Sequence, residues 1–103
     1  MAKQSFNDII RSDQPTLVDF YATWCGPCKM MHPVLEQLSG EIKGKARIIK
    51  IDIDKNQRLA DKLSIRSVPT FVIYKGGKIV WRKSGALSKE MLKSALSTHY
   101  QTA

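Results

Sequence analysis

The chain has 103 residues, of which 43% are hydrophobic and 25% are charged, so it can form one hydrophobic core, and we expect a single domain over residues 1–103. No apolar run approaches the roughly 20 residues of a transmembrane helix, and the start of the chain lacks the apolar stretch of a signal peptide, so we expect a cytoplasmic protein without a membrane span. Seventeen Lys and Arg against nine Asp and Glu give a net charge of +8, which we interpret as a solvated surface, although steering toward acidic partners and weak nucleic-acid affinity stay open.

The first predicted element is a short helix that the hydroxyl of Ser5 can cap. Its apolar residues are Phe6, Ile9 and Ile10. Residues 16–22 then predict the first strand, because they form an apolar run interrupted by a single acid. Since successive side chains of a strand alternate between its faces, this acid, Asp19, shares a face with Leu17 and Tyr21.

Two environments are open for Asp19. In a central strand of a mostly parallel sheet both faces are covered, so the carboxyl would be buried and its pKa would be raised. A buried acid of this kind could exchange protons with a neighbouring thiol. In an edge strand the same carboxyl would lie in solvent, and the pattern alone favours neither environment.

Residues 24–29, with the sequence WCGPCK, contain the only two cysteines of the chain, Cys25 and Cys28, where the first strand gives way to a helical pattern. A helix N-terminus carries partial positive charge and free N–H groups, which stabilise a thiolate. Cysteines this close constrain only a tiny loop of the unfolded chain, so they contribute little as a structural crosslink. The pair therefore indicates redox chemistry or metal binding.

Metal binding is the weaker of these two hypotheses. His32 follows Cys28 by one helical turn, so Cys25, Cys28 and His32 could supply three ligands. A structural zinc site needs four ligands, the chain has no third cysteine, and His99 is distant in the sequence. We therefore expect no bound metal.

After the helix that follows the cysteines, residues 46–53 predict a second strand with Ile49, Ile51 and Ile53 on one face. Lys50 lies inside this strand, where a lysine is usually an edge residue whose ammonium reaches solvent. Asn56 follows, in position to cap a short helix. The apolar residues of that helix are Leu59, Ala60 and Leu63.

The last third of the chain predicts a hairpin and a helix. Residues 70–74 and 79–81 are β-rich and are joined through Gly76 and Gly77, which is typical of an antiparallel hairpin. Ser88 can cap the final helix. The apolar face of that helix is formed by Met91, Leu92, Ala95 and Leu96. The order α-β-α-β-α-β-β-α predicts an α/β sandwich with helices on both faces of the sheet.

Three segments of the chain resemble the thioredoxin family. They are Val18-Asp19-Phe20 leading into residues 24–29, residues 67–70 (SVPT) and residues 84–88 (SGALS), and the similarity covers the chain from Ser5 onward. The resemblance implies a thioredoxin-like three-layer sandwich with a central mixed sheet of four strands. A fifth strand, which usually opens the family's fold, would have only residues 1–4 to form it.

The resemblance also implies a protein disulfide reductase, and it gives roles to particular residues. Cys25 would be the nucleophile and Cys28 the resolving thiol, and the Gly-Pro between them matches the reducing members of the family. Asp19 would be a buried acid and base, with Lys50 as its electrostatic partner. The residues expected to contact substrates are Trp24, Gly26, Pro27, Val68, Pro69 and Gly85, and the peptide bond before Pro69 would be cis.

The same resemblance implies the partners of the chain. The substrates would be proteins that contain disulfides, no cofactor would be bound, and a separate thioredoxin reductase, a flavoprotein using NADPH, would supply electrons. We expect a monomer with no nucleic-acid partner. The alternative is a non-catalytic module that only presents the surface formed by Trp24, Pro27, Val68 and Gly85, but the intact cysteine pair argues against that as the only role.

Overall fold

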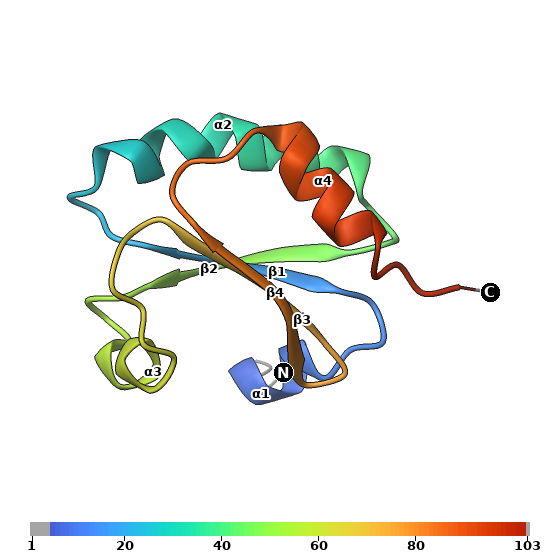
Figure 1. Cartoon of the computed structure of the whole chain (residues 1–103), viewed down its shortest axis with the longest axis horizontal. Helices are drawn as coiled ribbons and strands as arrows, with labels where there is room; N and C mark the ends of the chain where they lie inside the picture. Colours follow the sequence, from blue (N-terminus) through green and yellow to red (C-terminus); the bar gives the residue numbers. More distant parts are fainter. Residues whose placement is uncertain (1–4, 103) are drawn as a thin grey trace.

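A four-stranded mixed sheet forms the centre of the computed structural model, which describes residues 5–102 (Figure 1). Its strands are β1 (Thr16–Tyr21), β2 (Arg47–Asp52), β3 (Thr70–Lys75) and β4 (Lys78–Ser84), in the spatial order β2-β1-β3-β4. Strand β1 pairs with β2 in parallel and with β3 antiparallel, and β3 pairs with β4 antiparallel. The central position of β1 is what covers Asp19 on both sides.

Helices cover both faces of this sheet, as Figure 1 shows. They are α1 (Phe6–Ile10), α2 (Gly26–Glu41), α3 (Gln57–Lys62) and α4 (Lys89–Ser97). Helices α2 and α4 lie on one face, and α1 and α3 lie on the other. The predicted three-layer α/β sandwich with four strands is thereby confirmed, whereas the fifth strand would fall on residues 1–4, outside the described part of the chain. No helix within residues 5–102 is long and apolar enough to cross a membrane.

Two hydrophobic clusters, one on each face of the sheet, hold the layers together. The larger lies under α2 and α4 and contains Leu17, Met31, Leu35, Leu38, Ile42, Ala46, Phe71, Ile73, Leu92 and Leu96. The smaller lies against α1 and α3 and contains Ile10, Val18, Phe20, Val72 and Tyr74, with Ile49, Ile51 and Ile53 packed at its margin. Because strand residues alternate, Asp19 lies on the same face as Leu17, under α2.

Local sequence signals set most of the element ends. The hydroxyls of Ser5 and Ser88 accept hydrogen bonds from the N–H groups of Asp8 and Met91, so both predicted caps are confirmed. Asn56 occupies the N-cap position of α3, as predicted, but the side-chain cap predicted for it is wrong. Its amide group donates to the main-chain oxygen of Asp52 instead, and its side chain makes no capping bond to α3.

The prediction for the final helix needs one correction, whereas the prediction for the hairpin is confirmed. The sequence pattern puts Met91 on the buried face of α4, but its side chain is 43% exposed, because it lies at the margin of the face that Leu92 and Leu96 bury. The hairpin turn is as predicted, with positive φ angles of 60° at Gly76 and 82° at Gly77. Two positive φ angles in succession match the twist of a two-residue hairpin, and glycine adopts them without steric cost.

Candidate active site

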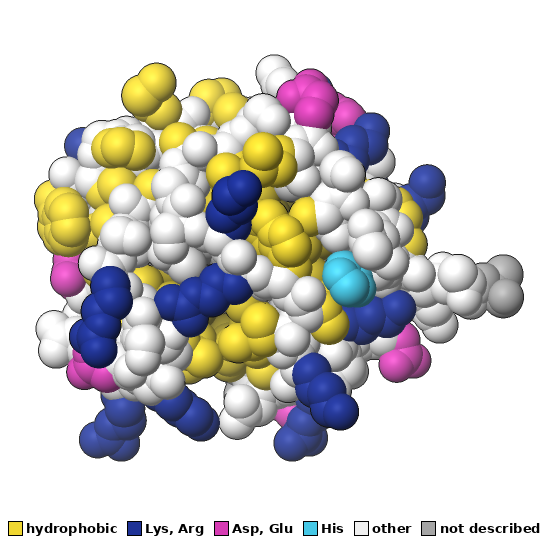
Figure 2. Space-filling model, viewed as in Figure 1, with side chains coloured by type: hydrophobic (Ala, Val, Ile, Leu, Met, Phe, Trp, Pro, Cys, Tyr) yellow, Lys and Arg dark blue, Asp and Glu magenta, His cyan; other side chains and the backbone are white. Residues whose placement is uncertain are grey.

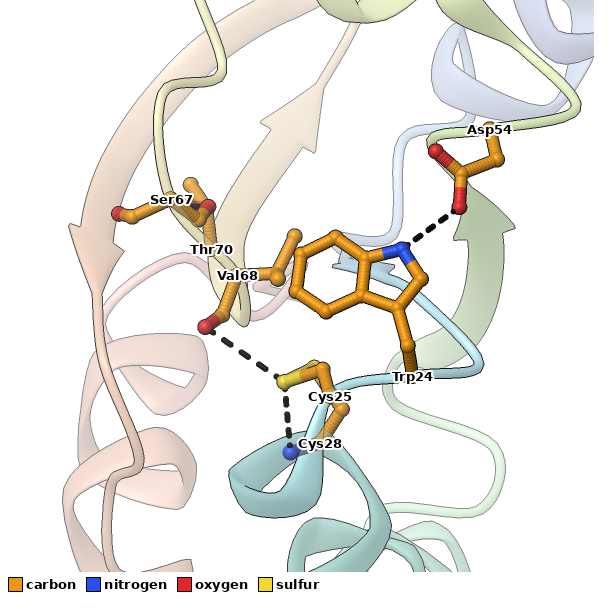
Figure 3. Close-up of a disulfide and its surroundings, with 7 residues drawn as sticks. All are labelled: Trp24, Cys25, Cys28, Asp54, Ser67, Val68 and Thr70. Carbon is orange, nitrogen blue, oxygen red and sulfur yellow. Dashed lines mark hydrogen bonds between the residues drawn. A yellow bond between two sulfur atoms is a disulfide. The ribbon is translucent and has the colours of Figure 1, made fainter.

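The two cysteines are joined in a disulfide at the N-terminus of α2, with their Cα atoms 5.3 Å apart. Cys25 is the N-cap residue of the helix, and its sulfur accepts a hydrogen bond from the N–H of Cys28 at 3.1 Å (Figure 3). The first turn of α2 contains no acidic residue. In the reduced chain the same N–H group and the helix dipole would favour a thiolate on Cys25.

The loop before β3 approaches the disulfide from the other side. Its peptide bond between Val68 and Pro69 is cis, as the resemblance implies. The carbonyl oxygen of Val68 lies 3.6 Å from the sulfur of Cys25, and the carbonyl oxygen of Pro69 accepts a hydrogen bond from the N–H of Gly85 at 2.8 Å. Segments that are far apart in the sequence therefore meet at Cys25.

The hydroxyl of Thr70 fixes the shape of this loop. It donates to the carbonyl oxygen of Ser67 at 2.8 Å and lies 2.9 Å from the hydroxyl of Ser84 (Figure 3 shows Ser67 and Thr70). Strand β4 is thus tied to the loop by side chains as well as by the main chain of Gly85. Sequence reasoning did not find this link.

Trp24 forms an exposed apolar surface beside the disulfide. Its side chain is 68% exposed, and its indole N–H donates to Asp54 at 2.9 Å (Figure 3). Asp54 is held in turn by Asp52, whose carboxylate accepts hydrogen bonds from the N–H groups of Asp54 and Lys55. Sequence reasoning missed Asp54, although an Asp-x-Asp-x-Asn run directly after a strand is a signal for an ordered turn.

Gly26 and Pro27 form the exposed start of α2 between the two cysteines. Pro27 occupies the first turn, where its missing N–H has no intrahelical partner to lose. The cysteines behind them are nearly covered, Cys25 at 4% and Cys28 at 1% exposed. Cys25 is therefore slightly more exposed than Cys28, although both residues are buried.

Asp19 is buried, with 1% of its surface exposed, so the edge-strand alternative is wrong. It is flanked in register by Lys50 of β2 and by the fully buried Phe71 of β3. Neither of its carboxyl oxygens has a hydrogen-bond partner within residues 5–102. Burial raises the pKa of Asp19 from 3.8 to about 6, and the nearby positive charge of Lys50 opposes part of that rise.

Lys50 does not pair directly with Asp19, since neither carboxyl oxygen of Asp19 has a hydrogen-bond partner within residues 5–102. Its ammonium group instead lies 2.5 Å from Nδ1 of His32. His32 therefore faces the β2 edge of the sheet. Over residues 5–102 no three His, Cys, Asp or Glu side chains are grouped so that they could hold a metal ion, and the geometry gives the metal hypothesis no support.

Lys and Arg side chains are dispersed over the face seen in Figure 2, with polar and hydrophobic surface between them. They do not gather into one basic patch on this face. This distribution agrees with the interpretation of the +8 charge as a solvated surface.

The fold and the cysteine pair define a dithiol–disulfide oxidoreductase. The family model described as Thioredoxin matches residues 1–98. Among curated proteins, the chain is 49% identical over 92 residues to Thioredoxin 2 of Chlorobaculum tepidum, covering 89% of this chain and 84% of that protein. It is 48% identical over 92 residues to a thioredoxin of Chlorobaculum thiosulfatiphilum, covering 89% of this chain and 85% of that one.

Solved structures agree with this result. A mutant thioredoxin from Halobacterium salinarum aligns with a TM-score of 0.85 at 34% identity, covering 99% of this chain and 88% of that one. Mitochondrial thioredoxin 3 of Saccharomyces cerevisiae, in its oxidized form, aligns with a TM-score of 0.81 at 34% identity, covering 90% and 86%. The chain belongs to the thioredoxin family. Membership implies disulfide substrates and a reductase partner.

Proposed function

We propose that this chain is a protein disulfide reductase in which Cys25 attacks the substrate and Cys28 resolves the intermediate. The observation that carries the proposal is the position of Cys25. It caps α2, it receives the N–H of Cys28, and it lies beside the exposed ring of Trp24, whereas Cys28 is covered behind it.

The reaction proceeds by two exchanges. The thiolate of Cys25 attacks one sulfur of the substrate disulfide, forming a mixed disulfide and releasing the other substrate sulfur as a thiolate. Cys28 then loses its proton and attacks the sulfur of Cys25. This step releases the second substrate thiolate, so the substrate gains two electrons and the cysteine pair becomes the disulfide seen in the structure.

Asp19 is proposed as the acceptor of the proton from Cys28. Cys28 is the first buried residue of α2, and Asp19 lies on the sheet face that this helix covers. With a pKa near 6, Asp19 is mostly ionised at neutral pH yet is a stronger base than an ordinary aspartate. Transfer is direct or through one water molecule. Lys50 limits the rise of this pKa and so keeps the base ionised.

Substrates bind to the surface around Cys25. One side of it is formed by Trp24, Gly26 and Pro27, and the other by Val68 and Gly85. Pro69 is itself buried and would act by shaping this loop. The carbonyl oxygen of Val68 lies 3.6 Å from the sulfur of Cys25, so this loop borders the reacting atom. A substrate chain in extended form would lie against the exposed edge of this loop.

The chain would act as a monomeric single domain in the cytoplasm, without a bound cofactor. Its disulfide would be reduced again by a separate thioredoxin reductase, a flavoprotein that draws electrons from NADPH. The thioredoxins among its relatives support this assignment. A purely structural binding module would have no use for a cysteine pair placed at a helix N-terminus.

The decisive experiment compares Cys28→Ser with Cys25→Ser in the reduction of a protein disulfide such as that of insulin. Cys28→Ser should accumulate a covalent complex through Cys25, and Cys25→Ser should form none, while both lose turnover. Redox titration of the wild-type pair should give a reducing potential. Trapping by Cys25→Ser alone would reverse the roles, and a strongly oxidising potential would contradict the reductase assignment.

A further inference from the structure

His32 contacts Lys50, the residue whose positive charge opposes the rise in the pKa of the buried Asp19. It lies on α2 one turn beyond Cys28, and its Nδ1 is 2.5 Å from Nζ of Lys50. An ammonium group has three donors and no acceptor, so Nδ1 must accept. This contact therefore uses the tautomer of the imidazole that has its proton on Nε2.

The imidazole is also held from the side of β1. The rings of Tyr21 and His32 meet edge to face, with their centroids 6.5 Å apart and their planes at 71°. His32 thus touches Tyr21 on β1 and Lys50 on β2 while it is carried by α2. Because the imidazole of His32 is carried by a helix and contacts two strands, it can hold the ammonium group of Lys50 in one position.

The position of Lys50 matters because it is the register partner of Asp19. Both side chains lie on the sheet face under α2, and the charge of Lys50 opposes the rise in the pKa of Asp19 without a direct hydrogen bond between them. Such an interaction acts through space, so it changes whenever the ammonium moves.

A competing partner for Lys50 lies one turn further along the same helix. Glu36 lines, together with Lys50, a shallow groove between α2 and β2. Without the imidazole, the ammonium would be free to move to this carboxylate and away from Asp19. The contact with His32 would keep the ammonium from making that move.

We propose that His32 is a positioning residue of the reaction, which holds Lys50 beside Asp19 and away from Glu36 and thereby sets the pH range in which Asp19 can take the proton of Cys28. This rests on the proposed function, since it assigns how the proton acceptor of that mechanism is controlled. Strand alternation puts Tyr21 of β1 and Asp52 of β2 on the same sheet face as Asp19 and Lys50. From α2, His32 contacts Lys50, and Glu36 lines the same groove as Lys50. Asp52 is occupied by the N–H groups of Asp54 and Lys55.

The test compares His32→Ala with His32→Asn in the full chain. Alanine removes the acceptor, whereas the Oδ1 of asparagine can replace Nδ1 as an acceptor that does not titrate. The first measurement is the titration of the Asp19 carboxyl by NMR. The second is the pH dependence of the resolving step in single-turnover reduction, with the KM for substrate measured alongside.

In His32→Ala, the titration of Asp19 should move to higher pH, because its neighbouring positive charge has moved away. If it moves by about half a unit, the resolving step should slow about threefold on the acidic side of its pH profile, with KM unchanged. His32→Asn should restore both. Glu36→Gln should change neither by itself, and in the His32→Ala background it should return part of the shift.

An unchanged Asp19 titration in His32→Ala would overturn the proposal, as would an equal shift in His32→Ala and His32→Asn. The NMR titration does not depend on turnover. If the chain failed to reduce disulfides, the proposed function would be refuted. The effect of His32 on the titration of Asp19 would still be decided by the NMR measurement.

Discussion

The N-terminal end of α2 lies over a carboxyl group that has no hydrogen-bond partner among residues 5–102, whereas its C-terminal end carries a carboxylate held by two lysines. Burial raises the pKa of Asp19, at the first end, to about 6. Glu41, at the second, receives hydrogen bonds from Lys89 and Lys93 of α4 at 2.7 and 2.8 Å, which lower its pKa to about 2. The same functional group therefore has a raised pKa at one end and a lowered pKa at the other.

This difference shows how one helix can serve both chemistry and structure. A carboxylate at a helix C-terminus faces the negative end of the dipole, and the two lysines offset that repulsion while linking α2 to α4. Lys50 offsets the burial of Asp19 only in part. The fold retains a buried acid whose ionisation lowers its stability, at the place where the proposed reaction needs a proton acceptor.

Among the substitutions that test this difference, Asp19→Asn should change the stability of the protein most. Between pH 3.8 and about 6 the unfolded chain releases a proton that the folded chain keeps, so the stability of the wild type falls as pH rises through this window. This shift in the pKa of Asp19 corresponds to about 3 kcal/mol in the free energy of unfolding. Urea unfolding should show the variant to be more stable by up to that amount at pH 8 and little changed at pH 3.

The same variant should resolve the mixed disulfide more slowly, because its amide cannot accept the proton of Cys28. Stability and rate would then move in opposite directions. Equal stability at both pH values together with an unchanged resolving rate would mean that the carboxyl has neither role.

Trp24→Ala should weaken substrate binding without changing the fold. Loss of an exposed aromatic contact costs about 1–2 kcal/mol at an interface, so KM for a protein disulfide should rise roughly tenfold. Steady-state kinetics would measure it. Met91→Ala is the matched control, since Met91 is 43% exposed on α4, and its substitution should leave KM unchanged. A similar rise in both variants would place the substrate contact elsewhere.

Ser88→Ala tests α4, the helix whose lysines hold Glu41 at the C-terminal end of α2. The hydroxyl of Ser88 caps α4 through the N–H of Met91 at 3.1 Å, and loss of such a cap typically costs about 1 kcal/mol. The midpoint of urea unfolding should fall accordingly, while the resolving rate should stay the same. A slower resolving step would show that the two ends of α2 are coupled through α4.

Glu41→Gln should have the smallest effect, because exposed ion pairs contribute little to stability and are screened by salt. The folded pKa lies below the unfolded value of 4.5, so the contribution is complete above pH 4.5 and is lost as pH falls toward 2. The variant should be slightly less stable than the wild type at pH 7 and equal to it near pH 2. A difference that persists in concentrated salt at pH 7 would indicate packing instead of charge.

Local patterns in the sequence predicted the features that depend on neighbouring residues. The caps at Ser5 and Ser88, the hairpin through Gly76 and Gly77, and the cysteine pair at a helix start are of this kind. Each needs only residues within a few positions of one another.

Contacts between distant segments could not be predicted in this way. The indole N–H of Trp24 donates to Asp54, thirty positions later. The sequence presents His32 only as a metal ligand, because nothing in the local pattern places it against Lys50. The burial of Asp19 depends on the place of β1 in the sheet, which the order of elements does not fix.

The central place of β1 also bears on the order in which the protein folds. The β3–β4 hairpin closes through two glycines, whereas Val18 of β1 pairs with Val72 across more than half of the chain. Closing so long a loop costs chain entropy before any contact forms. We expect pulse-labelling hydrogen exchange to find the hairpin amides protected before those of β1, and simultaneous protection would show instead that the sheet assembles in a single step.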